Sequence, residues 1–263
     1  MDFVEIEYRE RGGSWGMSEL QSHDYFELYF LIDGRRSFFL GDRAFNIKGR
    51  AFCIIPPFSM HKTSGESYKR ININVSPKLL SKRELSFLTS LAERAVFSLD
   101  GERYDHLIHL LWEASRIVIP DSEEEGRVSL AFVHTIIYML ENAALLPIDH
   151  GARVKDGAPD TLMLEVATYL NEHYREPLTL EEISEHFYIS KNSLSEKFKE
   201  AMSCTVMQYL AFLRLSRAKE LLQTTELGME KIAEMCGYSS PNYFSLIFKK
   251  SVGISPRGYR KAK

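Results

Sequence analysis

The sequence is poor in cysteine and in long apolar runs, and each shortage excludes a class of protein. Among 263 residues there are 3 cysteines, Cys53, Cys204 and Cys236, which are scattered and lack CxxC spacing. Such an odd set argues against a disulfide scaffold or a zinc site and indicates a reducing compartment. No run approaches the roughly 20 apolar residues that span a bilayer, and the acidic amino terminus lacks an apolar signal segment. We therefore expect a cytoplasmic protein with no membrane partner.

Acidic residues are missing from the end of the chain, between Ser240 and Lys263. Residues 1–150 hold 17 Lys and Arg against 22 Asp and Glu, a net charge of −5, whereas residues 151–263 hold 16 against 14, a net charge of +2. Cation density at the carboxyl end suits contact with a phosphate backbone. A solubilising tail is the alternative, but most of these cations lie in or beside a helix-turn-helix pattern, which favours phosphate contact. The cations are Lys249, Lys250, Arg257, Arg260, Lys261 and Lys263.

The first part of the chain has the period of β-strands. Short aromatic or β-branched segments, such as Phe26–Ile32, Ser37–Leu40 and Ala51–Ile55, are separated by turn residues that include Asp33-Gly34 and Lys48-Gly49. Short strands at this close spacing predict an antiparallel sandwich or barrel over about residues 1–75.

Beyond the strands the period becomes helical. Apolar residues recur at helical spacing through 78–146, and the segment Val128–Leu145 is apolar enough to be buried against the sheet or a second subunit. Residues 147–160 have no apolar period and are expected to be a linker. From residue 161 to 263 the pattern is helical throughout. The sequence therefore predicts an α+β protein of two domains, with a barrel and its following helices at 1–146 and an all-α domain at 161–263.

The helical region at the carboxyl end repeats itself. Phe198-Lys199-Glu200 is matched 50 positions later by Phe248-Lys249-Lys250, and Ile183-Ser184-Glu185 is matched 49 positions later by Ile232-Ala233-Glu234. The extra residue therefore falls between the two matched segments. A helical repeat that absorbs its length difference in a turn is typical of two helix-turn-helix units. In tandem, such units would present two recognition helices to successive stretches of major groove.

Helix-start signals agree with this layout. Thr179 with Glu182, and Thr205 with Gln208, have the spacing of capping boxes, in which two side chains each satisfy an unpaired backbone amide. Ser240-Pro241 places a cap and a first-turn proline at the start of the second recognition helix.

Several residues of the second unit together fit the signature of a known family. They are Ile232-Ala233, Gly237-Tyr238, Ser240-Pro241, Tyr243-Phe244, Phe248-Lys249-Lys250, Gly253, Ser255-Pro256 and Tyr259-Arg260. With these residues, and with the connecting segment Leu213–Leu222, the chain resembles the AraC/XylS family of bacterial transcription regulators. The resemblance implies a protein that binds promoter or operator DNA as a double strand and is not an enzyme.

Helical geometry divides each recognition helix into an inner and an outer face. Leu194 and Phe198 in the first helix, and Phe244 and Phe248 in the second, are spaced to face a core. On the outer face, Asn can read adenine through two hydrogen bonds and Leu can contact a thymine methyl, although a solvated helix face is the alternative at each position. The candidate DNA contacts are Lys191, Asn192, Ser195, Glu196, Lys199, Pro241, Asn242, Ser245, Leu246, Lys249, Lys250 and Arg257.

Two of these positions depart from the family pattern. Glu196 and Leu246 stand where members of the family often carry arginine. A glutamate can accept a hydrogen bond from cytosine N4, but near phosphates it is repelled. We therefore expect a distinctive operator sequence or a weak affinity of the monomer.

The amino-terminal region resembles the cupin-like sensing domain that many members of this family carry. The matching positions are His23, Glu27, Gly34, Pro56 and His61. The resemblance implies a small-molecule effector inside the barrel, and sugars are a frequent choice because regulators of this kind often serve carbon metabolism. The candidate polar contacts to the effector are Arg9, His23, Glu27 and His61.

The same residues leave a rival interpretation open. Metal-binding cupins use three histidines and a glutamate; His23, Glu27 and His61 match three of these four, and Gln21 stands where another histidine is usual. Such a set can hold iron or another divalent ion. Because sensing barrels of this family generally lack metal, we expect no cofactor and no metal site. A metal-dependent cupin enzyme with a helical appendage is the alternative, although it would not explain the tandem repeat.

The sequence thus predicts a sequence-specific transcriptional regulator controlled by a small molecule, with RNA polymerase as a further partner if it is an activator. A homodimer is expected to pair through the helices of residues 78–146. A monomer whose helices merely cover the barrel is the alternative. A regulator that acts through protein partners without a ligand also remains open.

Overall fold

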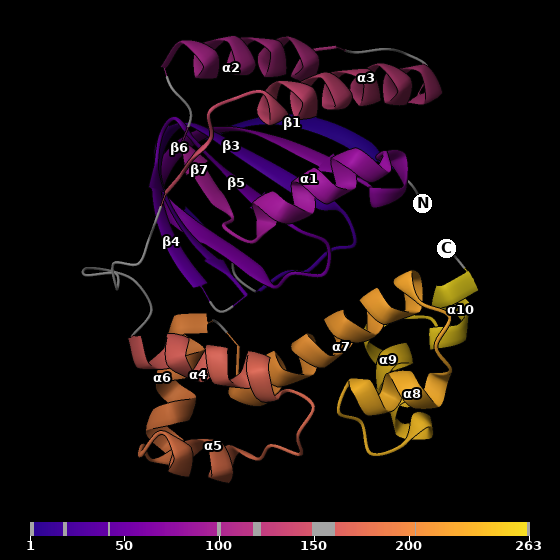
Figure 1. The fold of residues 1–263 in the computed structure, drawn as a ribbon. Helices are drawn as coiled ribbons and strands as arrows, with labels where there is room; N and C mark the ends of the chain where they lie inside the picture. The colour runs from indigo at the N-terminus through magenta and orange to yellow at the C-terminus, as the bar shows by residue number, and fades with distance from the viewer. Residues whose placement is uncertain are drawn as a thin grey trace.

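The computed structural model describes residues 3–17, 20–41, 43–98, 101–117, 122–148, 161–202 and 204–261. An antiparallel sheet with three accompanying helices comes first, and a wholly helical part follows (Figure 1). We call them the sheet domain and the helical domain. The predicted α+β architecture is therefore confirmed. Within the described ranges, no helix has both the length and the apolar character needed to cross a membrane.

One antiparallel sheet contains all the strands described in the sheet domain. Neighbouring strands follow the order β1, β6, β3, β5, β7, β8, while β2 pairs with β6 and β4 pairs with β3. The two long strands, β3 and β6, pair along most of their length. The strands are β1 (Val4–Arg11), β2 (Trp15–Gly16), β3 (Phe26–Leu40), β4 (Arg43–Lys48), β5 (Ala51–Ile55), β6 (His61–Val75), β7 (Val96–Ser98) and β8 (Leu146–Pro147).

The interruption predicted at Asp33-Gly34 is wrong. β3 runs without a break through these residues, and its pairing with β6 shifts register around them. Gly34 has a φ of +97°, and a Cβ there would lie 2.1 Å from the carbonyl oxygen of Ser67. Glycine at this point permits a bulge inside a continuous strand instead of a turn. As a result, β3 pairs with β5 before the bulge and with β4 after it.

Three helices cover one face of the sheet: α1 (Lys82–Ala92), α2 (Gly101–Ser115) and α3 (Ser122–Glu141), of which α2 and α3 lie side by side in Figure 1. Alternate residues of β3, such as Leu28 and Phe30, are buried in one cluster with Leu88, Leu111 and Ile137 of the three helices. The apolar segment predicted within 128–145 is therefore buried against the sheet of its own chain. Its role in a dimer stays a prediction.

Two strands lie in the region for which the sequence predicts helices. β7 pairs with β5, and β8 pairs with β7, so both extend the sheet. Each is at most three residues long, too short for an alternating period to appear in the sequence. Pro147, at the start of the predicted linker, belongs to β8, and residues 149–160 of that linker lie outside the described residues.

The helical domain consists of two helix-turn-helix units joined by one long helix, α7 (Figure 1). The predicted inward residues of the recognition helices are buried, Leu194 and Phe198 in one core and Phe244 and Phe248 in another. The helices are α4 (Thr161–His173), α5 (Leu180–His186), α6 (Lys191–Met202), α7 (Val206–Thr224), α8 (Met229–Met235), α9 (Pro241–Val252) and α10 (Pro256–Lys261).

The length difference between the two units lies in their turns. Tyr188 and Gly237 occupy equivalent positions and both are left-handed, with φ of 52° and 74°. Two residues separate Tyr188 from α6, whereas three separate Gly237 from α9. The extra residue of the second unit therefore follows the left-handed position, in the turn where the repeat analysis places it.

The predicted helix caps are confirmed. The hydroxyls of Thr179 and Thr205 accept hydrogen bonds from backbone amides three residues on and complete both capping boxes. Ser240 caps α9 in the same way by accepting from the amide of Tyr243, with Pro241 in the first turn. The starts of α5, α7 and α9 are therefore fixed by the local sequence.

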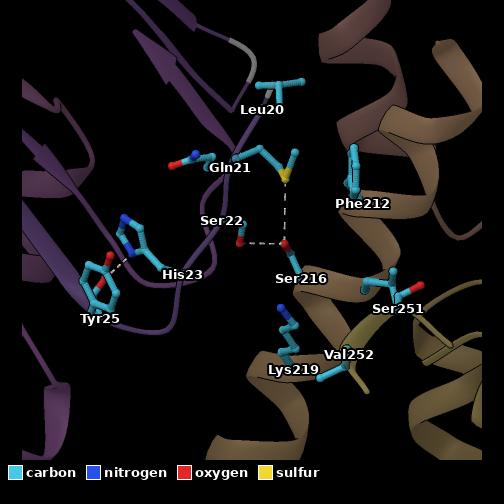
Figure 2. A pocket seen from close by; sticks show the side chains of 12 residues that line it. Leu20, Gln21, Ser22, His23, Tyr25, Phe212, Ser216, Lys219, Ser251 and Val252 are labelled. Carbon is cyan, nitrogen blue, oxygen red and sulfur yellow. Dashed lines mark hydrogen bonds between the residues drawn. The ribbon is translucent and has the colours of Figure 1, made fainter. Parts of the chain in front are cut away.

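The sheet domain and the helical domain meet along α7. The Ser22 and Ser216 hydroxyl oxygens lie 3.1 Å apart, and the Tyr209 hydroxyl donates to the Gly41 carbonyl at 2.7 Å. A cavity of about 410 Å³, which we call the interdomain cavity, lies beside these contacts (Figure 2). It is lined from the sheet domain by Leu20, Gln21, Ser22, His23, Tyr25 and Met60, and from the helical domain by Phe212, Leu215, Ser216, Lys219, Ser251 and Val252.

Candidate functional site

The outer faces of the two recognition helices, α6 and α9, are accessible to solvent. None of the predicted DNA contacts is buried. The half-buried ones are Ser195, Pro241 and Ser245. The exposed ones are Lys191, Asn192, Glu196, Lys199, Asn242, Leu246, Lys249, Lys250 and Arg257. The surface needed for a DNA interface is therefore present, and the individual contacts stay predictions.

Two of the cations near this surface already have partners within the protein. Lys191 forms an ion pair with Glu181 of α5, so a phosphate would have to compete with that carboxylate. Arg260 donates to the carbonyl oxygen of Leu227 at 2.6 Å and thereby fixes the loop before α8. Of the basic residues at the carboxyl end, Lys263 lies outside the described residues.

Two exposed tyrosines lie next to the predicted DNA contacts, and the sequence analysis did not count them among those contacts. Tyr188, in the turn before α6, is 98% exposed, and Tyr243, in the first turn of α9, is 51% exposed. A large aromatic side chain at a position that the helical period does not bury is the signal that could have identified them.

A second candidate site lies inside the sheet domain. Because side chains alternate across a strand, Glu27 and Tyr29 of β3 point away from the helix-covered face. With polar residues of β6 they line a cavity of about 420 Å³, which we call the sheet cavity. In Arg70–Asn74 the isoleucines pack toward the helices, while the arginine and the two asparagines line this cavity. That alternation is visible in the sequence, but it did not enter the prediction of the site.

Three of the four predicted effector contacts, Arg9, Glu27 and His61, line the sheet cavity. His23 is adjacent to Glu27 but lines the interdomain cavity. Its ring stacks on Tyr25 at a centroid distance of 3.8 Å and lies 4.8 Å from the ring of His61. His23 therefore stands between the two cavities.

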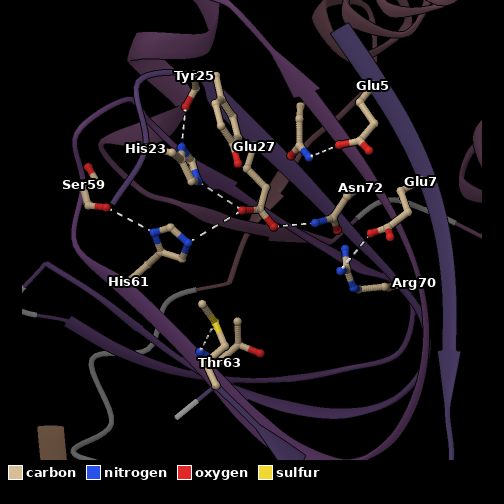
Figure 3. A network of polar contacts seen from close by, with 12 residues as sticks. Glu5, Glu7, His23, Tyr25, Glu27, Ser59, His61, Thr63, Arg70 and Asn72 are labelled. Atoms are coloured by element: carbon tan, nitrogen blue, oxygen red, sulfur yellow. Dashed lines mark hydrogen bonds and ion pairs between the residues drawn. The ribbon is translucent and has the colours of Figure 1, made fainter. Parts of the chain in front are cut away.

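Glu27 is the centre of a polar network in the sheet cavity (Figure 3). Its Oε2 lies 3.2 Å from His23 Nε2 and 3.7 Å from His61 Nε2, and its Oε1 accepts a hydrogen bond from the Asn72 amide. On the far side of each imidazole, Nδ1 faces a backbone carbonyl, that of Tyr25 at 2.9 Å for His23 and that of Ser59 at 3.1 Å for His61. These contacts between Nδ1 and backbone carbonyls fix the orientation of both imidazole rings.

Burial and charge oppose each other in this network. Burial alone would raise the pKa of Glu27, but the hydrogen bond with His23 and the nearby charges of His61, His23 and Arg70 outweigh it and hold that pKa below its ordinary value. Burial lowers the pKa of His61, against the attraction of Glu27. Glu27 is therefore stabilised as a carboxylate, and the pKa of His61 lies below that of an exposed imidazole.

Several buried polar atoms on the wall of the sheet cavity have no hydrogen-bond partner within the described part of the chain. They are the Tyr29 hydroxyl, one terminal nitrogen of Arg70, and the Oδ1 atoms of Asn72 and Asn74. An unpaired buried polar group costs about 1–3 kcal/mol. A polar molecule that pairs with these donors and acceptors would therefore be stabilised in the cavity.

Arg36, which the sequence analysis did not identify, supports the same wall. It is 1% exposed, and its guanidinium lies 5.3 Å from the ring of Trp15 and 4.6 Å from that of Tyr68. It donates to the carbonyl oxygen of Trp15 at 2.9 Å and to the hydroxyl of Thr63. Trp15 and Thr63 both line the cavity, so Arg36 fixes part of its boundary.

Known proteins share both parts of this arrangement. Residues 3–140 match the model of the AraC-like ligand binding domain, and residues 183–262 match that of a helix-turn-helix domain. The transcriptional activator RhaR of Escherichia coli O6:K15:H31 (strain 536) is 26% identical over 247 residues, which cover 91% of this chain and 86% of RhaR. The uncharacterised transcriptional regulator YfiF of Bacillus subtilis (strain 168) is 23% identical over 256 residues, covering 92% of this chain and 78% of YfiF.

Among solved structures, the carboxy-terminal domain of AraT, a response regulator from Geobacillus stearothermophilus, is 33% identical. The match covers 41% of this chain and 89% of that one, with a TM-score of 0.40. The ligand-binding-domain match alone spans more than half of the present chain. The protein therefore belongs to the AraC family of transcriptional regulators, with an amino-terminal ligand-binding domain and a carboxy-terminal DNA-binding helix-turn-helix domain.

Proposed function

We propose that this regulator binds specific DNA sequences under the control of a small polar molecule in the sheet cavity. The observation that carries the proposal is that Gln21 and Tyr25 line both the sheet cavity and the interdomain cavity. Between them, His23 reaches Glu27, and Ser22 contacts Ser216 of α7. A molecule that shifts this short segment from inside the sheet cavity would therefore alter the contact with α7.

Residues of α7 also connect the sheet domain to the part of the chain around the second recognition helix, α9. Gln223, near the end of α7, donates to Asp24 at 3.5 Å and to the Tyr259 hydroxyl at 3.2 Å. Ser251 and Val252, the last residues of α9, line the interdomain cavity. The effector would act by shifting the population between two arrangements of the helix-turn-helix units, which requires that it bind one arrangement more tightly.

The chemistry of the cavity wall favours a polyhydroxylated effector such as a sugar. Tyr29 and Arg70 offer donors, Asn72 and Asn74 offer acceptors, and Trp15 offers an aromatic side chain on which a sugar ring can stack. The volume of about 420 Å³ suits a small metabolite. Arg9, Glu27 and His61 would supply the remaining polar contacts.

The helical domain would bind double-stranded promoter DNA through α6 and α9. Relatives named transcriptional activators support activation, and in that case RNA polymerase is a further partner. A homodimer paired through α1, α2 and α3 stays a prediction, and sedimentation of the full chain with and without DNA decides it.

Selection of random duplex DNA by the full-length protein tests the proposal. We would run it at two salt concentrations, with and without a panel of pentoses and hexoses. Enrichment of two short elements about one helical turn apart is the expected result. If nothing is enriched and the weak binding disappears with salt, the protein contacts only phosphates and the proposal fails.

Restoring arginine at the two unusual positions is expected to tighten DNA binding. Glu196→Arg and Leu246→Arg each add a cation to an exposed outer face, so each should steepen the dependence of log K on log salt by roughly 0.9 if it adds one phosphate contact. Glu165→Arg on α4 makes the same charge change as Glu196→Arg away from both outer faces and should leave the slope unchanged. Equal slopes in all three variants would show that the outer faces of α6 and α9 do not contact DNA.

Widening the contact between the domains is expected to disconnect the effector from DNA. Ser216 is 9% exposed and touches Ser22 and Met60, so Ser216→Leu should push the sheet domain off α7. The sugar that raises the melting temperature most should still do so in this variant, but it should no longer change DNA affinity. Ser251→Ala, at the exposed rim of the same cavity, serves as the control. A sugar response that persists in Ser216→Leu would refute this route.

A further inference from the structure

Two histidines and a carboxylate converge on one point at the edge of the sheet cavity. The Nε2 atoms of His23 and His61 lie 3.2 and 3.7 Å from the same oxygen of Glu27, and the three ligand atoms all lie within 4.8 Å of one another. Atoms bound to one metal at roughly 2.1 Å lie about 3 to 3.5 Å apart at tetrahedral or cis-octahedral angles. Small side-chain rotations would bring this set to that spacing.

The surroundings of the three residues prepare them as ligands. A carbonyl can only accept a hydrogen bond, so each Nδ1 that faces one carries a hydrogen, and Nε2 is the ring nitrogen that would bind a metal after it gives up its own proton. Asn72 occupies Oε1 of Glu27 and leaves Oε2 for the common point. Partners of this kind behind each ligand are what orients metal ligands in proteins. Without a metal, the Nε2–H of His23 pairs with the carboxylate, and a divalent ion would displace that proton.

From this convergence we infer that His23, Glu27 and His61 bind a divalent first-row transition-metal ion. Two imidazoles with one carboxylate suit ions such as Zn²⁺ or Fe²⁺, whereas Mg²⁺ and Ca²⁺ prefer oxygen ligands alone. The remaining coordination positions would face the sheet cavity, which Glu27 and His61 line together with Gln21. The sequence-based expectation of no metal rested on the family resemblance alone. The proposal goes beyond effector control and does not depend on it.

Metal titration of the full-length chain tests the site. Protein freed of metal by dialysis against a chelator would be titrated with Co²⁺, followed by visible absorption, and with Zn²⁺, followed by calorimetry. One ion per chain is expected, with a Co²⁺ spectrum typical of nitrogen and oxygen ligands. His61→Gln and Glu27→Gln should lose this binding, and Asn72→Ala, which frees the carboxylate, should weaken it roughly 10- to 100-fold.

A matched histidine elsewhere gives the control. His134 on α3 lies 2.6 Å from Glu84, so His134→Gln removes a histidine of another His–Glu pair and should bind metal like the parent. Binding that is equal in the parent and in His61→Gln, with both chains folded by circular dichroism, would overturn the proposal, as would a parent that binds less than one ion per chain.

DNA selection on the same metal-free and metal-loaded samples tests the metal site and the proposed DNA-binding function separately. Specific DNA binding by a parent that takes up no metal overturns the metal site and leaves the regulator in place. Stoichiometric metal uptake by a parent that selects no DNA sequence supports the metal site and overturns the proposed control of specific DNA binding.

Discussion

Gly34→Ala is expected to destabilise the sheet domain by about 3 kcal/mol or more, because backbone strain and a clash with a neighbouring strand combine. A Cβ at this position would lie 2.1 Å from the Ser67 carbonyl oxygen and 2.9 Å from the Tyr68 Cα, and both are backbone atoms that cannot rotate away. The φ of +97° adds strain for any residue with a Cβ. The only relief is separation of β3 from β6, which together form the centre of the sheet.

Thermal and urea unfolding of the full chain measure this effect. A loss of that size should lower the melting midpoint by roughly 6 to 12 °C in a domain of this length. Gly12→Ala is the matched control, because a Cβ on Gly12 would meet nothing within 4 Å and its φ is not in the left-handed range. Equal midpoints for the two variants would show that the bulge at Gly34 does not require glycine.

Phe248→Ala is expected to destabilise the second helix-turn-helix unit by about 3 to 5 kcal/mol, the usual cost of removing a buried phenylalanine. Phe248 is 0% exposed, and the centroid of its ring lies 5.7 Å from that of Phe244 and 5.5 Å from that of Tyr259. The core of this unit is small, so the cavity has few neighbours that could collapse into it. Specific DNA binding should be lost together with the fold of α9.

Leu246→Ala, two residues away on the same helix, separates stability from recognition. Leu246 is 65% exposed, so its removal should change the unfolding free energy by less than about 0.5 kcal/mol. If it contacts a thymine methyl, the variant should instead lose preference at one base pair. Urea unfolding and repeated DNA selection on both variants make the comparison. A Phe248→Ala protein as stable as Leu246→Ala would contradict the proposed core.

The helical domain could be predicted from the sequence because its signals are local and repeated. Thr179, Thr205 and Ser240 each cap a helix through the residue three positions away, and the buried phenylalanines follow the helical period. The sheet domain is harder, since its contacts join distant residues. Asp33-Gly34 has the composition of a turn, and only the approach of Ser67 from another strand shows that it is a bulge.

The effector contacts were predicted from the resemblance, and the structure shows which cavity residues that resemblance omits. Arg9, Glu27 and His61 line one cavity, and their contact with an effector stays a prediction. Arg70 and the asparagines of β6 complete the lining, and Arg36 supports it from behind Trp15 and Thr63. Arg36 is buried against residues of two other strands, Trp15 of β2 and Thr63 and Tyr68 of β6, and no local pattern distinguishes a buried arginine from a surface one. The asparagines could have been found, because they alternate with isoleucines along a single strand.

The lining of the sheet cavity comes from two parts of the chain, and only one of them also contacts α7. Arg70, Asn72 and Asn74 lie on β6, whereas the parts that reach α7 belong to the segment from Gln21 to Tyr25. Under the proposed control by an effector, substitutions on β6 would exchange one effector for another while the contact with α7 stays intact. In the design of a biosensor for another small molecule, β6 is the strand to vary, and the segment from Gln21 to Tyr25 should be kept unchanged.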